Sequence, residues 1–350
     1  MLYERVGDVK SPIGYKGPHD MKSSRGFLLD ALIIQLLLTI ILSTGRMGND
    51  IVWAQDLGGS VLRDYPSALT LPKGRFEFSC DYLTADAPDN DSQTATSAMQ
   101  AFRLLANYGL GRRTTIMSSW THQRIDLGTD NLTIFSGDLA FKHNLIFRPT
   151  GWVPKLAIDA GIRTDRALGE DTFSVKTSTD NNQTGSVSIH DLEDTAYYAR
   201  LTAGQILGPF FPHLFLEYGQ NEINAKADIY TNEMTPDAST DLSRSETYLK
   251  TGLSLLLKFP YTALLHLEYD YLRLYRDQKL TIIDDNHFLR ADFNYYLTPS
   301  LVLNLGGQYA FHQLNGQIPF LYQEANQDTF DKKYSCLQLG LTVLFGGRNQ

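Results

Sequence analysis

The stretch Cys336-Leu-Gln-Leu-Gly-Leu-Thr-Val-Leu-Phe345 alternates between apolar and polar residues along its length. Successive side chains of a β-strand point to opposite faces, so this pattern predicts a strand with one apolar and one polar face. The apolar face carries Leu337, Leu339, Leu341, Val343 and Phe345. The polar face carries Cys336, Gln338, Gly340 and Thr342. The stretch therefore predicts a strand at a boundary between an apolar and a polar environment.

The same alternation recurs through the chain and predicts twelve strands, at about 74–84, 99–109, 112–122, 132–147, 154–164, 195–207, 211–223, 246–259, 261–275, 286–297, 300–312 and 333–345. Short connections rich in Gly and Pro lie at 109–111, 148–153, 208–210, 259–260 and 298–299. Long polar connections lie at 85–98, 123–131, 165–194, 224–245, 276–285 and 313–332. Outer-membrane barrels alternate tight periplasmic turns with long extracellular loops in this way. We therefore predict an all-β, closed antiparallel transmembrane barrel of about twelve strands in the bacterial outer membrane.

A soluble barrel or sandwich would show the same alternation with its apolar face inward. Two further features favour an apolar exterior. Aromatic residues gather near the short turns, as at Tyr108, Trp152 and Phe211, and again at the far strand ends, as at Trp120 and Tyr218. Two such bands are typical of the two membrane–water interfaces.

The second feature is the apolar run Ala31–Leu42, which is preceded by Lys22 and Arg25. It is too short for a comfortable transmembrane helix and predicts a signal peptide cleaved after Ala54. An uncleaved inner-membrane anchor is the alternative. We thus expect an upstream extension and signal peptide at 1–54, a periplasmic N-terminal segment at 55–73, the barrel at 74–345 and a C-terminal tail at 346–350.

The polar faces of the strands predict the lining of the lumen. Its acids are Glu77, Asp81, Asp138, Asp159, Glu217, Glu268, Asp270 and Asp292, and its bases are Arg75, Arg103, Lys142, Arg163, Arg200, Lys250, Lys258 and Arg290. Buried charges must be paired or solvated. Two interpretations stay open, a lumen closed by ion pairs or a wet passage whose walls carry both signs.

No motif predicts a catalytic residue, a cofactor or a metal site, so we expect no enzyme. The net charge of −8 argues against a nucleic-acid partner. Cys80 and Cys336 fall on the first and last strands but on opposite faces, which predicts two free thiols. His213 and His266 fall on the lumenal face, and His143 falls on the apolar face.

The segment Leu71-Pro-Lys-Gly-Arg-Phe-Glu-Phe78 and the hairpin end Asn107-Tyr-Gly-Leu-Gly-Arg-Arg113 resemble the start of the outer-membrane transporters grouped as the MetA phenol-degradation-pathway family. The resemblance covers mainly the first two hairpins and the general layout. It implies a monomeric barrel proposed to pass small, often hydrophobic, molecules, and it supplies no catalytic residues. The final strand ending on Phe345 also resembles the signal that the barrel insertion machinery reads, although five residues follow it.

The sequence thus favours a passive outer-membrane channel or transporter for small molecules, hydrophobic ones among them. The alternatives are a structural or surface-binding barrel with a sealed lumen and, third, an outer-membrane lipid hydrolase. The partners we expect are outer-membrane lipid, the insertion machinery through the last strand and a small-molecule solute.

Overall fold

The computed structural model describes residues 62–86, 98–126, 131–147, 153–168, 173–178, 184–230, 238–259, 263–276, 284–312 and 333–346. All of them belong to one compact unit, Asp50–Gln350. The predicted signal peptide lies outside the described residues, as does most of the C-terminal tail. Within the described residues, no helix has the length and apolar character needed to cross a membrane.

In the residues that the structure describes, fourteen strands form a single antiparallel sheet. They are β1 (Phe76–Asp86), β2 (Ala98–Gly109), β3 (Thr114–Asp126), β4 (Asn131–Ile146), β5 (Lys155–Ala167), β6 (Phe173–Ser178), β7 (Thr184–Gly204), β8 (Phe210–Tyr230), β9 (Ala238–Asp241), β10 (Arg244–Phe259), β11 (Ala263–Tyr275), β12 (Asp285–Thr298), β13 (Leu301–Ala310) and β14 (Tyr334–Phe345). All twelve strands predicted from the sequence are present, and β6 and β9 are additional.

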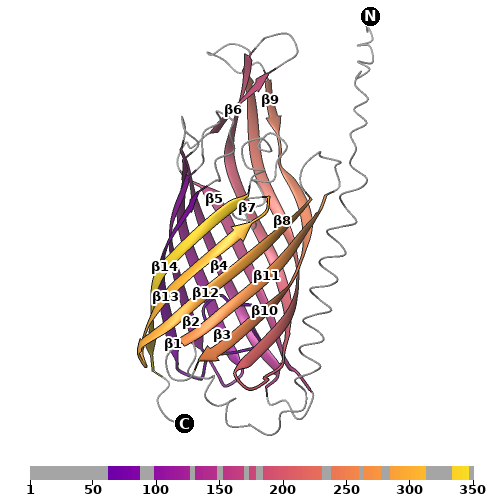
Figure 1. Ribbon diagram of the computed structural model, residues 1–350. Helices are drawn as coiled ribbons and strands as arrows, with labels where there is room; N and C mark the ends of the chain where they lie inside the picture. The colour runs from indigo at the N-terminus through magenta and orange to yellow at the C-terminus, as the bar shows by residue number, and fades with distance from the viewer. Residues whose placement is uncertain are drawn as a thin grey trace, which may run out of the picture. The chain divides into compact units, whose positions relative to one another are not determined.

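The barrel closes where the first strand meets the last. β1 pairs with β14 from Phe76 opposite Phe345 to Asp86 opposite Ser335. The remaining neighbours pair in chain order, apart from β6 and β9, and β7 pairs directly with β8. Twelve strands therefore form a closed barrel, drawn in Figure 1 as a ring of tilted arrows. Closure leaves no unpaired strand edge in the wall, which a lipid environment requires.

The extracellular hairpins differ from the sequence prediction. β7 and β8 are each 21 residues long, and β6 and β9 flank them beyond the barrel wall (Figure 1). The prediction of loops throughout 165–194 and 224–245 is therefore wrong. The predicted long loop 123–131 is also wrong, because β3 runs to Asp126 and β4 begins at Asn131. These segments lack the outward apolar face that marks a strand in lipid, because they lie at or beyond the edge of the lipid layer.

The outer face of the barrel is apolar. Leu337, Leu339 and Leu341 of β14 are 68%, 54% and 46% exposed, whereas Thr342 and the lumenal residues of other strands are buried. The apolar-out orientation inferred from alternation is therefore confirmed. A closed β-barrel with an apolar exterior is the architecture of bacterial outer membranes. The protein is an outer-membrane β-barrel, with the short turns at its periplasmic end.

Candidate functional site

Residues 62–71 lie inside the barrel, and we call them the lumenal segment. Tyr65, Ala68 and Arg63 are fully buried, and Leu69 and Leu71 are nearly so. The sequence predicts a periplasmic segment at 55–73, whereas residues 62–71 of it lie against the lumenal wall. Nothing in the periodicity of the segment marks it, since its contacts come from strands distant in the chain.

The segment enters beside the first hairpin, where a carboxylate holds its backbone. Glu77 of β1 accepts hydrogen bonds from the backbone N–H groups of Leu62 and Arg63 at 2.7 and 2.6 Å. The side-chain amide of Asn107 in β2 donates to the backbone carbonyl of Arg63 at 3.0 Å and to the Glu77 carboxylate at 2.9 Å. Backbone groups that would be unsatisfied in the barrel interior are thereby paired.

The side chain of Arg63 reaches the centre of the wall. Its guanidinium lies 2.6 Å from the Asp81 carboxylate, and both side chains are fully buried. Gly340 faces Asp81 across the β1–β14 pair, and a β-carbon there would collide with the carboxylate. The glycine on the polar face of the last strand therefore makes room for this ion pair.

Asp64 links the segment to two separate parts of the barrel wall, β2 and β12. Its carboxylate lies 3.1 Å from Arg103 of β2 and accepts two hydrogen bonds from Arg290 of β12, at 3.0 and 3.1 Å. Burial would raise the pKa of Asp64, but the positive charges of Arg290 and Arg103 hold it well below its ordinary value. Asp64 is therefore ionised and acts as a charged anchor for the segment.

Tyr65 packs on a polar network formed by three adjacent strands. Its ring stacks on the imidazole of His266 with centroids 3.9 Å apart, and its hydroxyl is hydrogen-bonded to the side-chain amide of Asn294. His266 Nε2 lies 3.0 Å from Ser254 Oγ, and Nδ1 lies 3.3 Å from Asp292 Oδ2. The segment thus covers a Ser–His–Asp arrangement.

This arrangement does not favour hydrolysis. Glu268 lies 3.4 Å from the same His266 Nε2 that a nucleophilic Ser254 would need. A tetrahedral intermediate also requires free N–H donors, whereas backbone N–H groups within a sheet are used in strand pairing. On the lipid-facing side, His143 contacts Thr114 at 2.9 Å. We interpret the His266 network as a docking surface for Tyr65.

The other half of the wall carries a second set of paired charges. Glu217 of β8 receives hydrogen bonds from Arg200 at 2.7 Å and from Tyr248 at 2.8 Å. Asp138 of β4 pairs with Arg163 at 3.2 Å. Paired charges of both signs therefore surround the lumen at this level.

Fourteen of the sixteen predicted lumen residues project into the barrel and have polar partners there. They are Glu77, Asp81, Arg103, Asp138, Lys142, Asp159, Arg163, Arg200, Glu217, Lys250, Glu268, Asp270, Arg290 and Asp292. We call these the charged belt. The remaining two, Arg75 and Lys258, are half-buried at the periplasmic end. Both predicted lumenal histidines, His213 and His266, are buried.

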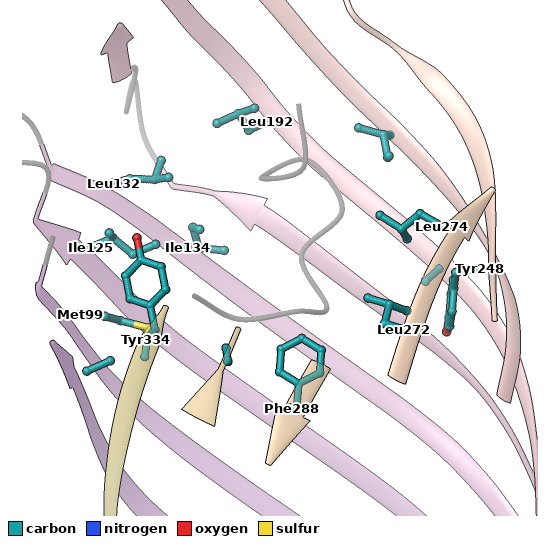
Figure 2. Close-up of a cluster of buried hydrophobic side chains, with 14 of the residues drawn as sticks. Met99, Ile125, Leu132, Ile134, Leu192, Tyr248, Leu272, Leu274, Phe288 and Tyr334 are labelled. Atoms are coloured by element: carbon teal, nitrogen blue, oxygen red, sulfur yellow. The ribbon is translucent and has the colours of Figure 1, made fainter. Parts of the chain in front are cut away.

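An apolar ring lines the extracellular end of the lumen. Figure 2 shows its side chains projecting from strands on opposite sides of the wall, with Ile125 and Leu132 far along the ring from Leu272 and Leu274. The labelled members are Met99, Ile125, Leu132, Ile134, Leu192, Tyr248, Leu272, Leu274, Phe288 and Tyr334. Single-strand periodicity could not find the ring, because inward apolar residues interrupt the polar face only near the strand ends.

A cavity of about 220 Å³ lies inside the barrel. Met99 and Phe288 of the apolar ring line it, together with members of the charged belt and with Arg63 and Asp64 of the lumenal segment. Cys336 also lines it, whereas Cys80 lies on the outer face, and both thiols are free as predicted. Across the part of the chain that the structure describes, no three His, Cys, Asp or Glu side chains are arranged to hold a metal ion.

No protein-family model and no curated protein matches the sequence. The resemblance to the MetA phenol-degradation-pathway family is therefore not confirmed. The general class of that family, the outer-membrane β-barrels, does fit this protein.

Several solved structures show similarity. The translocator domain of autotransporter NalP from Neisseria meningitidis is 13% identical, with a TM-score of 0.47 over 77% of this chain and 88% of that chain. The NanC porin is 7% identical, with a TM-score of 0.42 over 77% and 98%. The CymD monoaromatic hydrocarbon channel is 11% identical, with a TM-score of 0.40 over 80% and 90%. TM-scores below 0.5 license no transfer of function, so the fold assignment rests on the strand pairing.

Proposed function

We propose that the protein is a passive outer-membrane channel for small molecules, and that the lumenal segment closes its periplasmic end. The observation that carries the proposal is the internal cavity, which lies between the apolar ring and residues 62–71. A barrel with a purely structural role needs no such space. Passive transport follows a gradient and needs no nucleotide site.

The lining of the cavity supports a solute that is partly apolar and carries hydrogen-bond donors. Met99 and Phe288 supply apolar surface. Oδ1 of Asp270 and both carboxyl oxygens of Asp159 are buried and accept no hydrogen bond from any residue that the structure describes, although Lys250 pairs with the other oxygen of Asp270 at 2.7 Å. Buried acceptors without partners favour a ligand that satisfies them. The volume suits a solute of roughly the size of benzene or somewhat larger unless the segment moves, since a cavity of about 150 Å³ already holds benzene.

A sealed, non-transporting barrel is the second candidate, and the ion pairs of Asp64 favour it. An anchor to both Arg103 and Arg290 holds the segment across the lumen. If the anchored state is permanent, the lumen conducts nothing. The two candidates therefore differ in whether the lumenal segment can leave its site.

Planar-bilayer recording and liposome swelling with glycerol separate the two candidates. We expect rare, small conductance steps and slow swelling for the refolded wild-type protein. We expect large steps and fast swelling for a variant carrying both Asp64→Asn and Tyr65→Ala. If the folded variant, checked by heat-modifiable gel migration, conducts no ions and passes no glycerol, the channel proposal fails and the sealed barrel stands.

A further inference from the structure

The periplasmic end of the barrel carries unpaired positive charge on two turns that lie side by side. Lys73 belongs to the turn before β1, and Arg112 and Arg113 belong to the turn between β2 and β3. All three are exposed, and we call them the basic collar. None of them forms an ion pair with a residue that the structure describes.

Backbone hydrogen bonds hold the two turns together. Gly74 donates from its N–H to the Gly109 carbonyl at 2.8 Å, and Gly109 donates to the Arg75 carbonyl at 2.9 Å. Gly74 has φ of 74°, a conformation that a residue with a β-carbon rarely adopts. The turns are therefore rigid neighbours, and their three cations form one surface.

The surface lies where lipid headgroups meet the barrel. Phe345 and Tyr108, on the outer faces of β14 and β2, are 53% and 42% exposed just beside these turns. The Arg113 guanidinium lies 6.0 Å from the centroid of the Phe147 ring. Aromatic rings at such a position mark the membrane–water interface, so the collar is level with the headgroups of the inner leaflet.

The charge is not balanced at this end of the molecule. The sequences of the five periplasmic turns, and the residues flanking the barrel at 72–75 and 346–350, contain no Asp or Glu. The extracellular connections are acidic by contrast, with Asp89, Asp91, Glu170, Asp171, Glu233, Asp237, Asp277, Glu324, Asp328 and Asp331. In the charged belt every base has an acidic partner, with the half-buried Arg75 and Lys258 lying outside it. At the periplasmic end the collar thus carries positive charge that faces outward and has no acidic partner among the described residues.

We propose that the basic collar binds the headgroups of anionic phospholipids, such as phosphatidylglycerol, in the inner leaflet of the outer membrane. A phosphodiester matches the chemistry of the site, because guanidinium groups donate paired hydrogen bonds to phosphate oxygens and a lysine adds a point charge. Basic residues beside a membrane attract anionic lipid in the same way. This inference is independent of the channel proposal, since it concerns the outer rim and not the lumen.

The experiment measures lipid retained by the full-length folded protein. The protein is reconstituted in nanodiscs of phosphatidylcholine with a minority of phosphatidylglycerol, and lipids released with it are counted by native mass spectrometry. We expect the wild type to retain phosphatidylglycerol in excess of its bulk share. In the Lys73→Gln/Arg112→Gln/Arg113→Gln variant that excess should disappear, with a loss of about fivefold in relative affinity for each charge removed.

A matched variant at the other end of the barrel controls for net charge. Arg124→Gln/Arg166→Gln/Lys226→Gln removes the same number of charges from exposed residues of β3, β5 and β8. It should retain phosphatidylglycerol as the wild type does. A conservative Arg112→Lys/Arg113→Lys variant should keep the preference and covers the case in which the glutamine variant does not fold.

Three outcomes overturn the proposal. The first is an unchanged excess in the collar variant. The second is an equal loss in both triple variants, which would assign the effect to net charge. The third is the absence of excess phosphatidylglycerol on the wild type, which would indicate that the collar binds a soluble acidic partner instead of lipid.

Discussion

The ring of Tyr65 lies flat on the imidazole of His266, with ring centroids 3.9 Å apart and planes inclined by 23°. Tyr65 comes from the lumenal segment and His266 lies near the start of β11, so the contact joins the closing element to the wall. Arg290 lies on the Tyr65 ring as well, 5.4 Å from its centroid. Tyr65 is therefore held by both His266 and Arg290 of the wall.

Replacing Tyr65 by alanine should weaken closure. Loss of the buried, stacked contacts of this ring should destabilise the closed state by about 2 kcal/mol, which shifts the open–closed equilibrium roughly thirtyfold. We expect a comparable rise in open probability in planar-bilayer recordings. Tyr82→Ala is the control, because Tyr82 is 49% exposed on the outer face. An identical open probability in Tyr65→Ala and the wild type would contradict the docking role.

Closure should withstand mild acid and fail in strong acid. Burial opposes the ionisation of Asp64, yet Arg290 and Arg103 hold its pKa well below the ordinary value. The ion pairs of Asp64 therefore stabilise the docked state fully when the pH is above the pKa of the undocked Asp64, about 3.9. This stabilisation is lost as the pH falls through the lower pKa of the docked Asp64.

Conductance should therefore stay constant from neutral pH to about pH 4 and rise only below that value. The Asp64→Asn variant should conduct more at neutral pH and lack the acid rise, because it has no proton to gain at this position. Conductance recorded as a function of pH in both proteins tests the assignment. An acid rise that persists in Asp64→Asn would show that another group controls it.

Removing the charge of Glu217 should destabilise the barrel. Its carboxylate is fully buried and receives hydrogen bonds from Arg200 and Tyr248. Glu217→Gln leaves the Arg200 guanidinium without its close partner, which costs about 3 kcal/mol in a buried site. Urea titration of refolding into liposomes measures the loss. Glu222→Gln on the same strand is the matched control, because Glu222 is exposed and should change stability little. Equal stability of the two variants would refute the pairing.

Modification of Cys336 should block solute passage, because its thiol lines the cavity. In the Tyr65→Ala background, a bulky water-soluble thiol reagent should slow glycerol swelling of liposomes. The block should persist in Cys80→Ala, since Cys80 faces outward, and should vanish in Cys336→Ala. A block that follows Cys80 in place of Cys336 would mean that the solute does not pass through this cavity.

Local pattern was enough to find the barrel. Alternation in stretches such as Cys336–Phe345 assigns each residue to one of two faces, and the pairing of Cys80 with Leu341 and of Cys336 with Ala85 agrees with those faces. The alternation no longer marks a strand where its outward face leaves the lipid. In the extracellular half of β8 the apolar residues, such as Ile223 and Ala225, face the barrel interior and the outward residues are polar, so the outward apolar face that marks a strand in lipid is missing.

The sequence by itself determined the strands, the inward and outward faces and most of the charged belt, because the period of a strand is a local property set by the backbone. Only the tertiary structure decided that residues 62–71 occupy the lumen, that Asp64 joins Arg103 to Arg290 and that an apolar ring narrows the extracellular end. Those features depend on closure, which brings β2, β12 and the lumenal segment together across large distances in the chain. Pair contacts of that kind leave no periodic trace in a single sequence.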